Sequence, residues 1–223
     1  MKSAEELLGD LAQNQGETQV LHAWQTQLVD TIHFLHGKGW APATSSNYSI
    51  RPFDSGMFWV SASGIDKGTF GPEHLMQVDR QGKPVHDNRK PSAETLIHCL
   101  IYELFPETRC ILHTHSVYNT VLSTAHAPQS KVVLEGYEVQ KGIRGIDTHD
   151  SRLEIPVLPN SQDMVAFCSL LREIHGQNPT FSAFLIAGHG LYTWGTEVHE
   201  AKRHIEVIEF LLEVTYKLKT YTA

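Results

Sequence analysis

The sequence contains little cysteine, no long apolar segment and no excess of basic residues. Its 3 cysteines are too few and too scattered for a disulfide framework in a chain of 223 residues. No segment approaches the roughly 18 uncharged apolar residues that a membrane span requires. The 25 acidic residues outnumber the 18 basic ones and give a formal charge of −7. These absences predict a soluble globular protein that binds neither a membrane nor a nucleic acid.

The chain also lacks a secretory signal, an internal repeat and a convincing linker. The first residues do not combine a basic region with an apolar core, so we expect a cytoplasmic protein. Ser3 and Glu6 have the spacing of a capping box and predict a short helix at the N-terminus. The length predicts a single domain over residues 1–223.

Apolar periodicity predicts helices that alternate with short strands. Apolar residues at three- and four-residue spacing predict helices over 17–37, 92–104, 117–125, 162–174 and 196–218. Short apolar runs predict strands over 47–51, 57–61, 109–115, 131–134, 155–158, 181–187 and 191–194. Strands that alternate with helices indicate an α/β or mixed α+β layered domain.

Histidine is unusually abundant, with 14 residues in the chain. His113 and His115 stand two apart in the predicted strand 109–115, so both imidazoles would face the same side about 6.5 Å apart along the backbone. That spacing suits chelation of one metal ion by two rings. A His-x-His pattern also arises by chance in a histidine-rich chain, so the pair alone leaves both interpretations open.

His189 is the third candidate ligand. It stands between Gly188 and Gly190 directly after a predicted apolar strand, where sites collect in α/β proteins. Flanking glycines let the backbone turn sharply and approach another group closely. Without the upstream pair, Gly-His-Gly would indicate an ordinary turn. Three neutral imidazoles with open positions are typical of a catalytic divalent site rather than a structural zinc site.

Two carboxylates, Glu94 and Glu138, are candidate proton carriers. Glu94 lies at the start of a predicted helix, where the helix dipole by itself favours an acidic residue. Glu138 lies in a glycine-bounded segment that is also typical of an exposed turn. From spacing alone, a structural or surface role is the better interpretation of both.

Taken together, these motifs resemble the class II aldolase/adducin family over nearly the whole chain. The segments that carry the resemblance are GWAPATSSNYSIR (39–51), SASGI (61–65), PSAE (91–94), HTH (113–115) and GHG (188–190). Three further segments are similar to a dehydratase branch of the family: SGIDKG (63–68), EVQKGI (138–143) and LYTWG (191–195).

The resemblance implies an α/β fold with αβα layers around a mainly antiparallel sheet, and a homotetramer with sites near subunit interfaces. It implies one Zn²⁺ per subunit, held by His113, His115 and His189. It also implies a phosphorylated ketose substrate whose phosphate is held by Asn47, Ser63, Gly64, Ser92 and Lys67. Glycine turns, hydroxyl groups and helix N-termini are suitable donors to a phosphate, although each of these residues also fits an ordinary polar turn.

The dehydratase branch removes water from a methylthio-substituted ketose phosphate in methionine salvage. By this resemblance Glu138 is the general acid/base, and Glu94, which matches the proton-transfer carboxylate of the aldolases, is the second candidate. Two alternatives stay open. One is an aldolase or epimerase that acts on another phosphorylated ketose, and the other is a non-catalytic, adducin-like interaction protein.

Overall fold

A computed structural model describes residues 4–221, and side chains from residue 15 onward. Its α-helices are α1 (Ala4–Gly37), α2 (Thr95–Leu104), α3 (Val117–His126), α4 (Met164–Gln177) and α5 (Val198–Tyr221). Its strands are β1 (Tyr48–Ile50), β2 (Phe58–Ser61), β3 (Leu75–Val78), β4 (Cys110–Thr114), β5 (Lys131–Leu134), β6 (Leu153–Leu158), β7 (Ala183–Ile186) and β8 (Gly190–Gly195). The helix and strand order follows the alternation that the sequence predicts.

All eight strands form one sheet, in the order β3-β2-β1-β4-β8-β7-β6-β5. Within the described residues only the β6–β7 pair is parallel, and the other strand pairs are antiparallel. The prediction of a mainly antiparallel sheet is therefore confirmed. The two central strands are β4 and β8, which belong to distant parts of the sequence.

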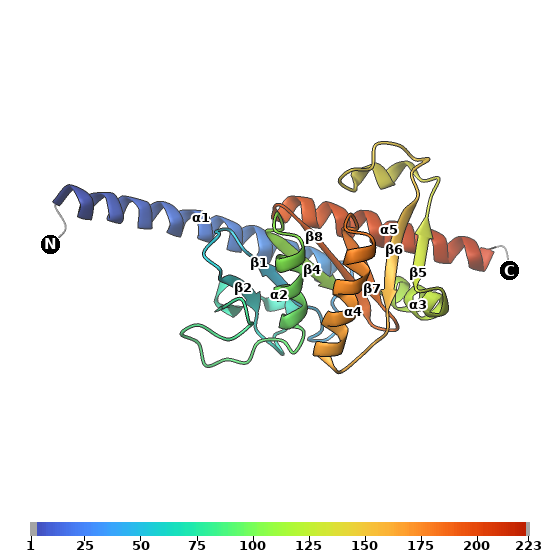
Figure 1. The fold of residues 1–223 in the computed structure, drawn as a ribbon, viewed down its shortest axis with the longest axis horizontal. Coiled ribbons are helices and arrows are strands. Elements are labelled where there is room, and N and C mark those ends of the chain that lie inside the picture. Colours follow the sequence, from blue (N-terminus) through green and yellow to red (C-terminus); the bar gives the residue numbers. More distant parts are fainter. Residues whose placement is uncertain (1–3, 222–223) are drawn as a thin grey trace.

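Helices cover both faces of the sheet, and Figure 1 shows α2 and α4 on the near face with α5 behind the strands. Alternation along β4 divides the core, because Leu112 packs with residues of α1, α3 and α5, whereas Ile111 packs with residues of α2 and α4. Phe184 and Leu185 of β7 divide in the same way. The αβα layering is confirmed.

The structure differs from the predicted elements in the N-terminal helix and in one short strand, where the sequence pattern is weak. A single helix, α1, replaces the expected short N-terminal helix and the separate helix over 17–37, and its first half extends past the sheet (Figure 1). Ser3 of the expected capping box lies outside the described residues. Strand β3 was not expected, since its four residues lack an apolar alternation, and pairing with β2 decides its structure. No helix in residues 4–221 is long and apolar enough to cross a bilayer.

The core on the α5 side predicts unequal effects for two substitutions on that helix. Ile208 is fully buried, so Ile208→Ala should lower the free energy of unfolding by about 2–5 kcal/mol through lost burial and a cavity. Phe210 is half exposed, so Phe210→Ala on the same helix should cost less than about 1 kcal/mol. Urea unfolding of both variants measures the difference, and equal costs would contradict the packing of α5.

Candidate active site

Antiparallel pairing of β4 with β8 brings the three predicted ligands together. In the register of this pair, Thr114 lies opposite Leu191 and His113 lies opposite Tyr192. His115 follows the end of β4, while His189 lies in the turn just before β8, so the two residues meet at the same end of the strand pair. The ring centroids of His115 and His189 are 4.8 Å apart, and those of His113 and His115 are 4.5 Å apart.

Both glycines beside His189 have a structural requirement, as the sequence predicted for a close backbone approach. Gly188 has a φ of +63°, a left-handed conformation that glycine adopts without strain. A Cβ on Gly190 would lie 2.3 Å from the Thr114 carbonyl oxygen and 2.7 Å from Cε1 of His113. The turn therefore packs against the His113 ring at a distance that only glycine allows.

The three imidazoles have the donor arrangement that a divalent ion needs. One ring nitrogen from each residue lies within 4.8 Å of the others. His113 Nδ1 is 3.0 Å from the Leu191 carbonyl oxygen and donates to it, which leaves Nε2 as the unprotonated nitrogen. That Nε2 atom is buried and receives no hydrogen bond within the described part of the chain. The residues present thus fit a metal ion bound through three imidazole nitrogens.

Burial keeps two of these rings uncharged near neutral pH. His113 is fully buried, and this burial holds the pKa of its imidazole well below the usual value despite the nearby Glu94. Burial also lowers the pKa of His115 to about 4, with a further decrease from His189. Since a metal ion binds the neutral form of histidine, neither ring has to release a proton first.

Glu94 lies beside the cluster, and its side chain serves the site rather than its own helix. It occupies the N-cap position of α2 but caps no backbone amide there. Its Oε1 is 3.0 Å from His189 Nε2, and its Oε2 accepts hydrogen bonds from Asn47 Nδ2 at 2.6 Å and from the Tyr192 hydroxyl at 2.9 Å. The structure therefore brings the second candidate carboxylate to within hydrogen-bond distance of the predicted ligands.

The contacts of Glu94 favour its ionised form. Burial alone would raise the pKa of this carboxyl, but the nearby imidazoles of His113 and His189 and the amide of Asn47 hold the pKa well below its usual range. An ionised carboxylate only accepts hydrogen bonds, which fits the donors that surround it.

A small polar cavity of about 170 Å³ opens beside Glu94, His115 and His189. It brings together four of the five residues predicted to hold a phosphate, namely Asn47, Ser63, Gly64 and Ser92. Gly64 has a φ of +77°, so the turn at 63–65 depends on glycine. Residues with hydroxyl groups are the most numerous in the lining of this cavity, as expected for a site that binds a phosphate.

Lys67, the fifth predicted residue, does not line that cavity. Its side chain is buried, and Nζ donates to the carbonyl oxygens of Ile65 at 2.8 Å and Thr44 at 3.3 Å. Burial lowers the pKa of this amine to about 8. In this position Lys67 joins the loops 42–46 and 63–65, and both of those loops border the cavity.

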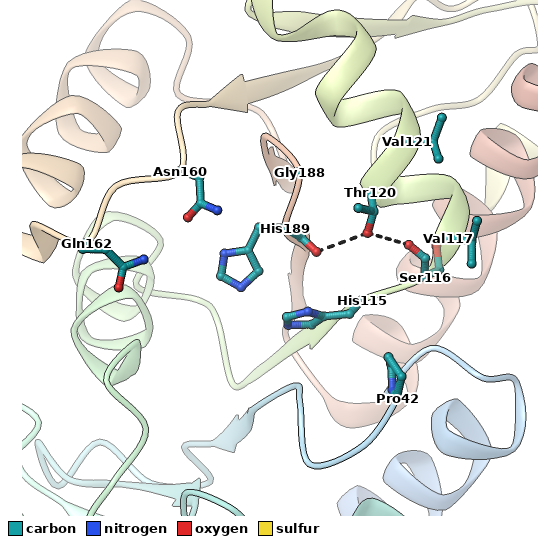
Figure 2. Close-up of a pocket in the computed structure, with 10 residues that line it drawn as sticks. All are labelled: Pro42, His115, Ser116, Val117, Thr120, Val121, Asn160, Gln162, Gly188 and His189. Atoms are coloured by element: carbon teal, nitrogen blue, oxygen red, sulfur yellow. Dashed lines mark hydrogen bonds between the residues drawn. The ribbon is translucent and has the colours of Figure 1, made fainter.

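A wider cavity of about 550 Å³ also borders His115 and His189 (Figure 2). The amides of Asn160 and Gln162 stand on one wall, and Val117 and Val121 of α3 stand on the opposite wall. The Thr120 hydroxyl lies within hydrogen-bond distance of the carbonyl oxygens of Ser116, at 2.8 Å, and His189, at 3.3 Å. These contacts join the start of α3, next to His115, to the turn that carries His189. His115 and His189 therefore line both cavities, whereas His113 is buried.

The structure places Glu138 away from the histidines of its own chain. Glu138 follows β5 in a short 3₁₀ helix, at the end of the strands where Leu134 pairs with Leu153. His189 follows the end of β7, where Ile186 pairs with Leu158 at the opposite end of β6. The length of β6 separates these ends by about 16 Å. The Glu138 side chain is exposed and pairs with Lys141 and His149. The segment 138–143 therefore does not bring Glu138 to the histidines of its own chain.

Sequence reasoning missed Tyr192 and His98, which complete the surroundings of Glu94. Tyr192 stacks on His113 with ring centroids 4.0 Å apart and donates to Glu94. His98 Nε2 lies 2.5 Å from Asn47 Oδ1. The available signals were the strand alternation that places Tyr192 opposite His113 and the four-residue spacing from Glu94 to His98, but neither is distinctive in isolation.

On the other sheet face, Glu209 of α5 binds the segment that runs from the end of β4 into α3. Its buried carboxyl accepts hydrogen bonds from Thr114 Oγ1 at 2.7 Å, Ser116 Oγ at 2.5 Å and Asn119 Nδ2 at 2.9 Å. Thr114 and Ser116 flank His115 directly. Glu209 therefore fixes the backbone that carries this ligand candidate.

A layered α/β domain that presents three imidazoles and a partly buried carboxylate beside a polar cavity has the layout of a metal-dependent enzyme for a small polar substrate. The family model for the class II aldolase and adducin N-terminal domain matches residues 26–216. The chain belongs to the class II aldolase and adducin family.

Relatives with similar sequences have one activity in their names. The chain is 48% identical over 194 residues to a methylthioribulose-1-phosphate dehydratase from Picosynechococcus sp., covering 85% of this chain and 91% of the relative. It is 45% identical over 186 residues to a methylthioribulose-1-phosphate dehydratase from Hahella chejuensis, covering 83% of this chain and 89% of the relative.

Solved structures share the fold at lower identity. YgbL from Escherichia coli matches with a TM-score of 0.75 and 23% identity, covering 89% of this chain and 91% of that chain. L-fuculose-1-phosphate aldolase from Thermus thermophilus matches with a TM-score of 0.70 and 22% identity, covering 91% of this chain and 96% of that chain. The predicted fold class is confirmed by these similarities.

Glu209 predicts a pH dependence of stability. Burial raises the pKa of Glu209 from 4.5 to about 7, so between these values the folded state retains a proton that the unfolded state has released. The free energy of unfolding should therefore fall as pH rises through this window, by on the order of 3 kcal/mol. Urea unfolding between pH 4 and 8 should show that Glu209→Gln removes this decrease.

Glu213→Gln, on the same helix, is the matched control. Lys217 lowers the pKa of the exposed Glu213 carboxyl, so this residue contributes with the opposite sign and its substitution should leave the decrease in place. Identical pH profiles for wild type and Glu209→Gln would contradict the assignment.

Proposed function

We propose that this protein removes water from 5-methylthioribulose 1-phosphate and forms 2,3-diketo-5-methylthiopentyl 1-phosphate, a step of methionine salvage. The observation that carries the proposal is that three imidazoles, an ionised Glu94 and a polar cavity lie together in one place. Sequence identity of 45–48% to dehydratases of that name supports the choice of substrate.

Zn²⁺ is the proposed cofactor, one ion per subunit on His113, His115 and His189. Three imidazoles without a thiolate are typical of catalytic zinc sites, which keep positions open for substrate. A bound ion would polarise the C2 carbonyl of the ketose and stabilise negative charge that develops on the neighbouring oxygens.

Residues of the chain bind the substrate and transfer the protons. Asn47, Ser63, Gly64 and Ser92 bind the phosphate in the small cavity, and Lys67 holds the loops that form it. Glu94 accepts the proton from C3. A second carrier protonates the C4 hydroxyl, which leaves as water, and the resulting enol becomes the diketone. The carbon skeleton and the phosphate are unchanged, so the net reaction is loss of one water molecule.

Glu138 serves as the second carrier only if another subunit supplies it. The length of β6 separates Glu138 from the histidines of its own chain, yet the side chain is exposed, so a neighbouring subunit can reach it. We infer a homotetramer in which Glu138 of one copy completes the site of the next. This arrangement retains the general acid/base role that the motif predicts and agrees with the observed distance.

Removal of metal should abolish turnover. Chelation followed by metal analysis should reduce the ion content from about one per chain to near zero and remove the dehydratase activity, and Zn²⁺ should restore both. His115→Ala should bind less metal and lose turnover, whereas His199→Ala, on the N-terminal part of α5, is the matched control. Full activity after exhaustive chelation would contradict the metal proposal.

Product analysis separates this activity from its alternatives. A diketone phosphate with release of water supports dehydration. Dihydroxyacetone phosphate from another ketose phosphate would indicate an aldolase, and a stereoisomer of the substrate would indicate an epimerase. Absence of turnover on every ketose phosphate would support a non-catalytic interaction protein.

The two carboxylates predict a complementation result. Glu94→Gln and Glu138→Gln should each lower kcat about 10²–10⁴-fold, because each removes a proton carrier. When both variants assemble in one oligomer, about a quarter of the sites should combine an intact Glu94 with an intact Glu138 from a neighbour, and activity should return. No recovery in mixed oligomers, or normal turnover by Glu138→Gln, would contradict the role of Glu138.

A further inference from the structure

A chain of buried hydrogen bonds leads from the core to Glu94. The Tyr102 hydroxyl is 2.8 Å from Ser49 Oγ, and Ser49 Oγ is 2.7 Å from His98 Nδ1. His98 Nε2 is 2.5 Å from Asn47 Oδ1, and Asn47 Nδ2 is 2.6 Å from Glu94 Oε2. We call these five residues the Tyr102–Glu94 chain.

Helix and strand periodicity build this chain. Glu94, His98 and Tyr102 are spaced by four residues along the N-terminal cap and body of α2, so they share one helix face. Asn47 and Ser49 are two residues apart at β1 and face the same side of the sheet. The helix face packs on that side, so the two sets of side chains alternate in space.

Each hydrogen bond in the chain has one direction. An ionised Glu94 only accepts, so Asn47 must present its amide nitrogen to it and its carbonyl oxygen to His98. His98 must then donate from Nε2, which leaves Nδ1 to accept from the Ser49 hydroxyl. Because the Ser49 proton is used in that bond, the Tyr102 hydroxyl must donate to Ser49.

Burial makes the arrangement rigid. His98 and Ser49 are fully buried, and Asn47 and Tyr102 are each 5% exposed, so a broken link has little access to water. Burial lowers the pKa of His98 to about 4, so the ring is neutral near pH 7, in agreement with one donating and one accepting nitrogen. The rest of the mechanism does not use His98, although it lies one hydrogen bond from a substrate-site residue.

We propose that His98 is a positioning residue that fixes the Asn47 amide with its nitrogen toward Glu94 and thereby orients Glu94 at the three histidines. Without the Nε2–H donor, Asn47 Oδ1 retains only a longer hydrogen bond of 3.3 Å from the Tyr192 hydroxyl, and Asn47 Nδ2 has a second, longer bond of 3.4 Å to Ser92 Oγ, so the orientation of the amide is less constrained. The Tyr192 hydroxyl still donates to Glu94 at 2.9 Å, so the loss should be partial.

His98→Phe tests the proposal, because phenylalanine keeps a buried ring but removes both nitrogens. We expect kcat to fall about 10–100-fold, as for other supporting residues of active-site ligands, with KM changed less than about threefold. His98→Gln retains a donor near the position of Nε2 and should recover most of the activity. His204→Phe is the matched control, since His204 is equally buried and bonds to the Trp194 carbonyl oxygen away from the histidines.

A double-mutant cycle distinguishes positioning from a general structural effect. If His98 acts through Asn47, then His98→Phe should have no further effect on kcat in the Asn47→Ala background. Multiplicative losses in the double variant, or an equal kcat loss in His204→Phe, would overturn the proposal.

Nitrogen NMR of the His98 ring provides a readout independent of turnover. The spectrum should show the neutral Nε2–H form between pH 6 and 8. The Asn47 side-chain amide signals should shift in His98→Phe and remain in place in His204→Phe. An Nδ1–H form of His98, or unchanged Asn47 signals, would overturn the positioning role. The proposal rests on the catalytic role of Glu94, and these spectra remain informative even if wild-type protein fails to dehydrate methylthioribulose 1-phosphate.

Discussion

The antiparallel register of β4 with β8 is the constraint on which the site depends. It places His113 beside Tyr192 and brings the ends of both strands to the loop that carries His189. A shift of one residue would turn His113 to the opposite sheet face, away from Glu94. The close contact of Gly190 with the Thr114 carbonyl oxygen opposes such a shift, because no other residue fits that space.

Both faces of β4 use buried polar groups to hold the same ligand segment. On the α2 face, His113 lies beside Glu94, and Glu94 accepts hydrogen bonds from Asn47 and Tyr192. On the α5 face, Thr114 donates to Glu209. Buried polar groups are costly unless each finds a partner, so these two carboxylates and their donors specify one arrangement of the strand end.

Much of the fold and the metal-ligand set follows from local patterns. The strand periodicity around His113 and the glycines around His189 predict two parts of the cluster separately, and family motifs join them. The small polar cavity also collects four predicted phosphate residues. The positions of Glu138 and Lys67 could not be predicted from the sequence. Both residues lie in motifs whose spacing does not specify where the side chains lie relative to the sheet.

The sequence by itself determined the alternation of helices and strands, the candidate histidines and the family, because periodicity and motifs are properties of neighbouring residues. Only the tertiary structure decided which carboxylate meets the histidines and how it is held. Strand order and register bring Glu94, Asn47, His98 and Tyr192 within hydrogen-bond distance and leave Glu138 at the far end of β6. Such contacts arise between residues far apart in the chain, and no local pattern encodes them.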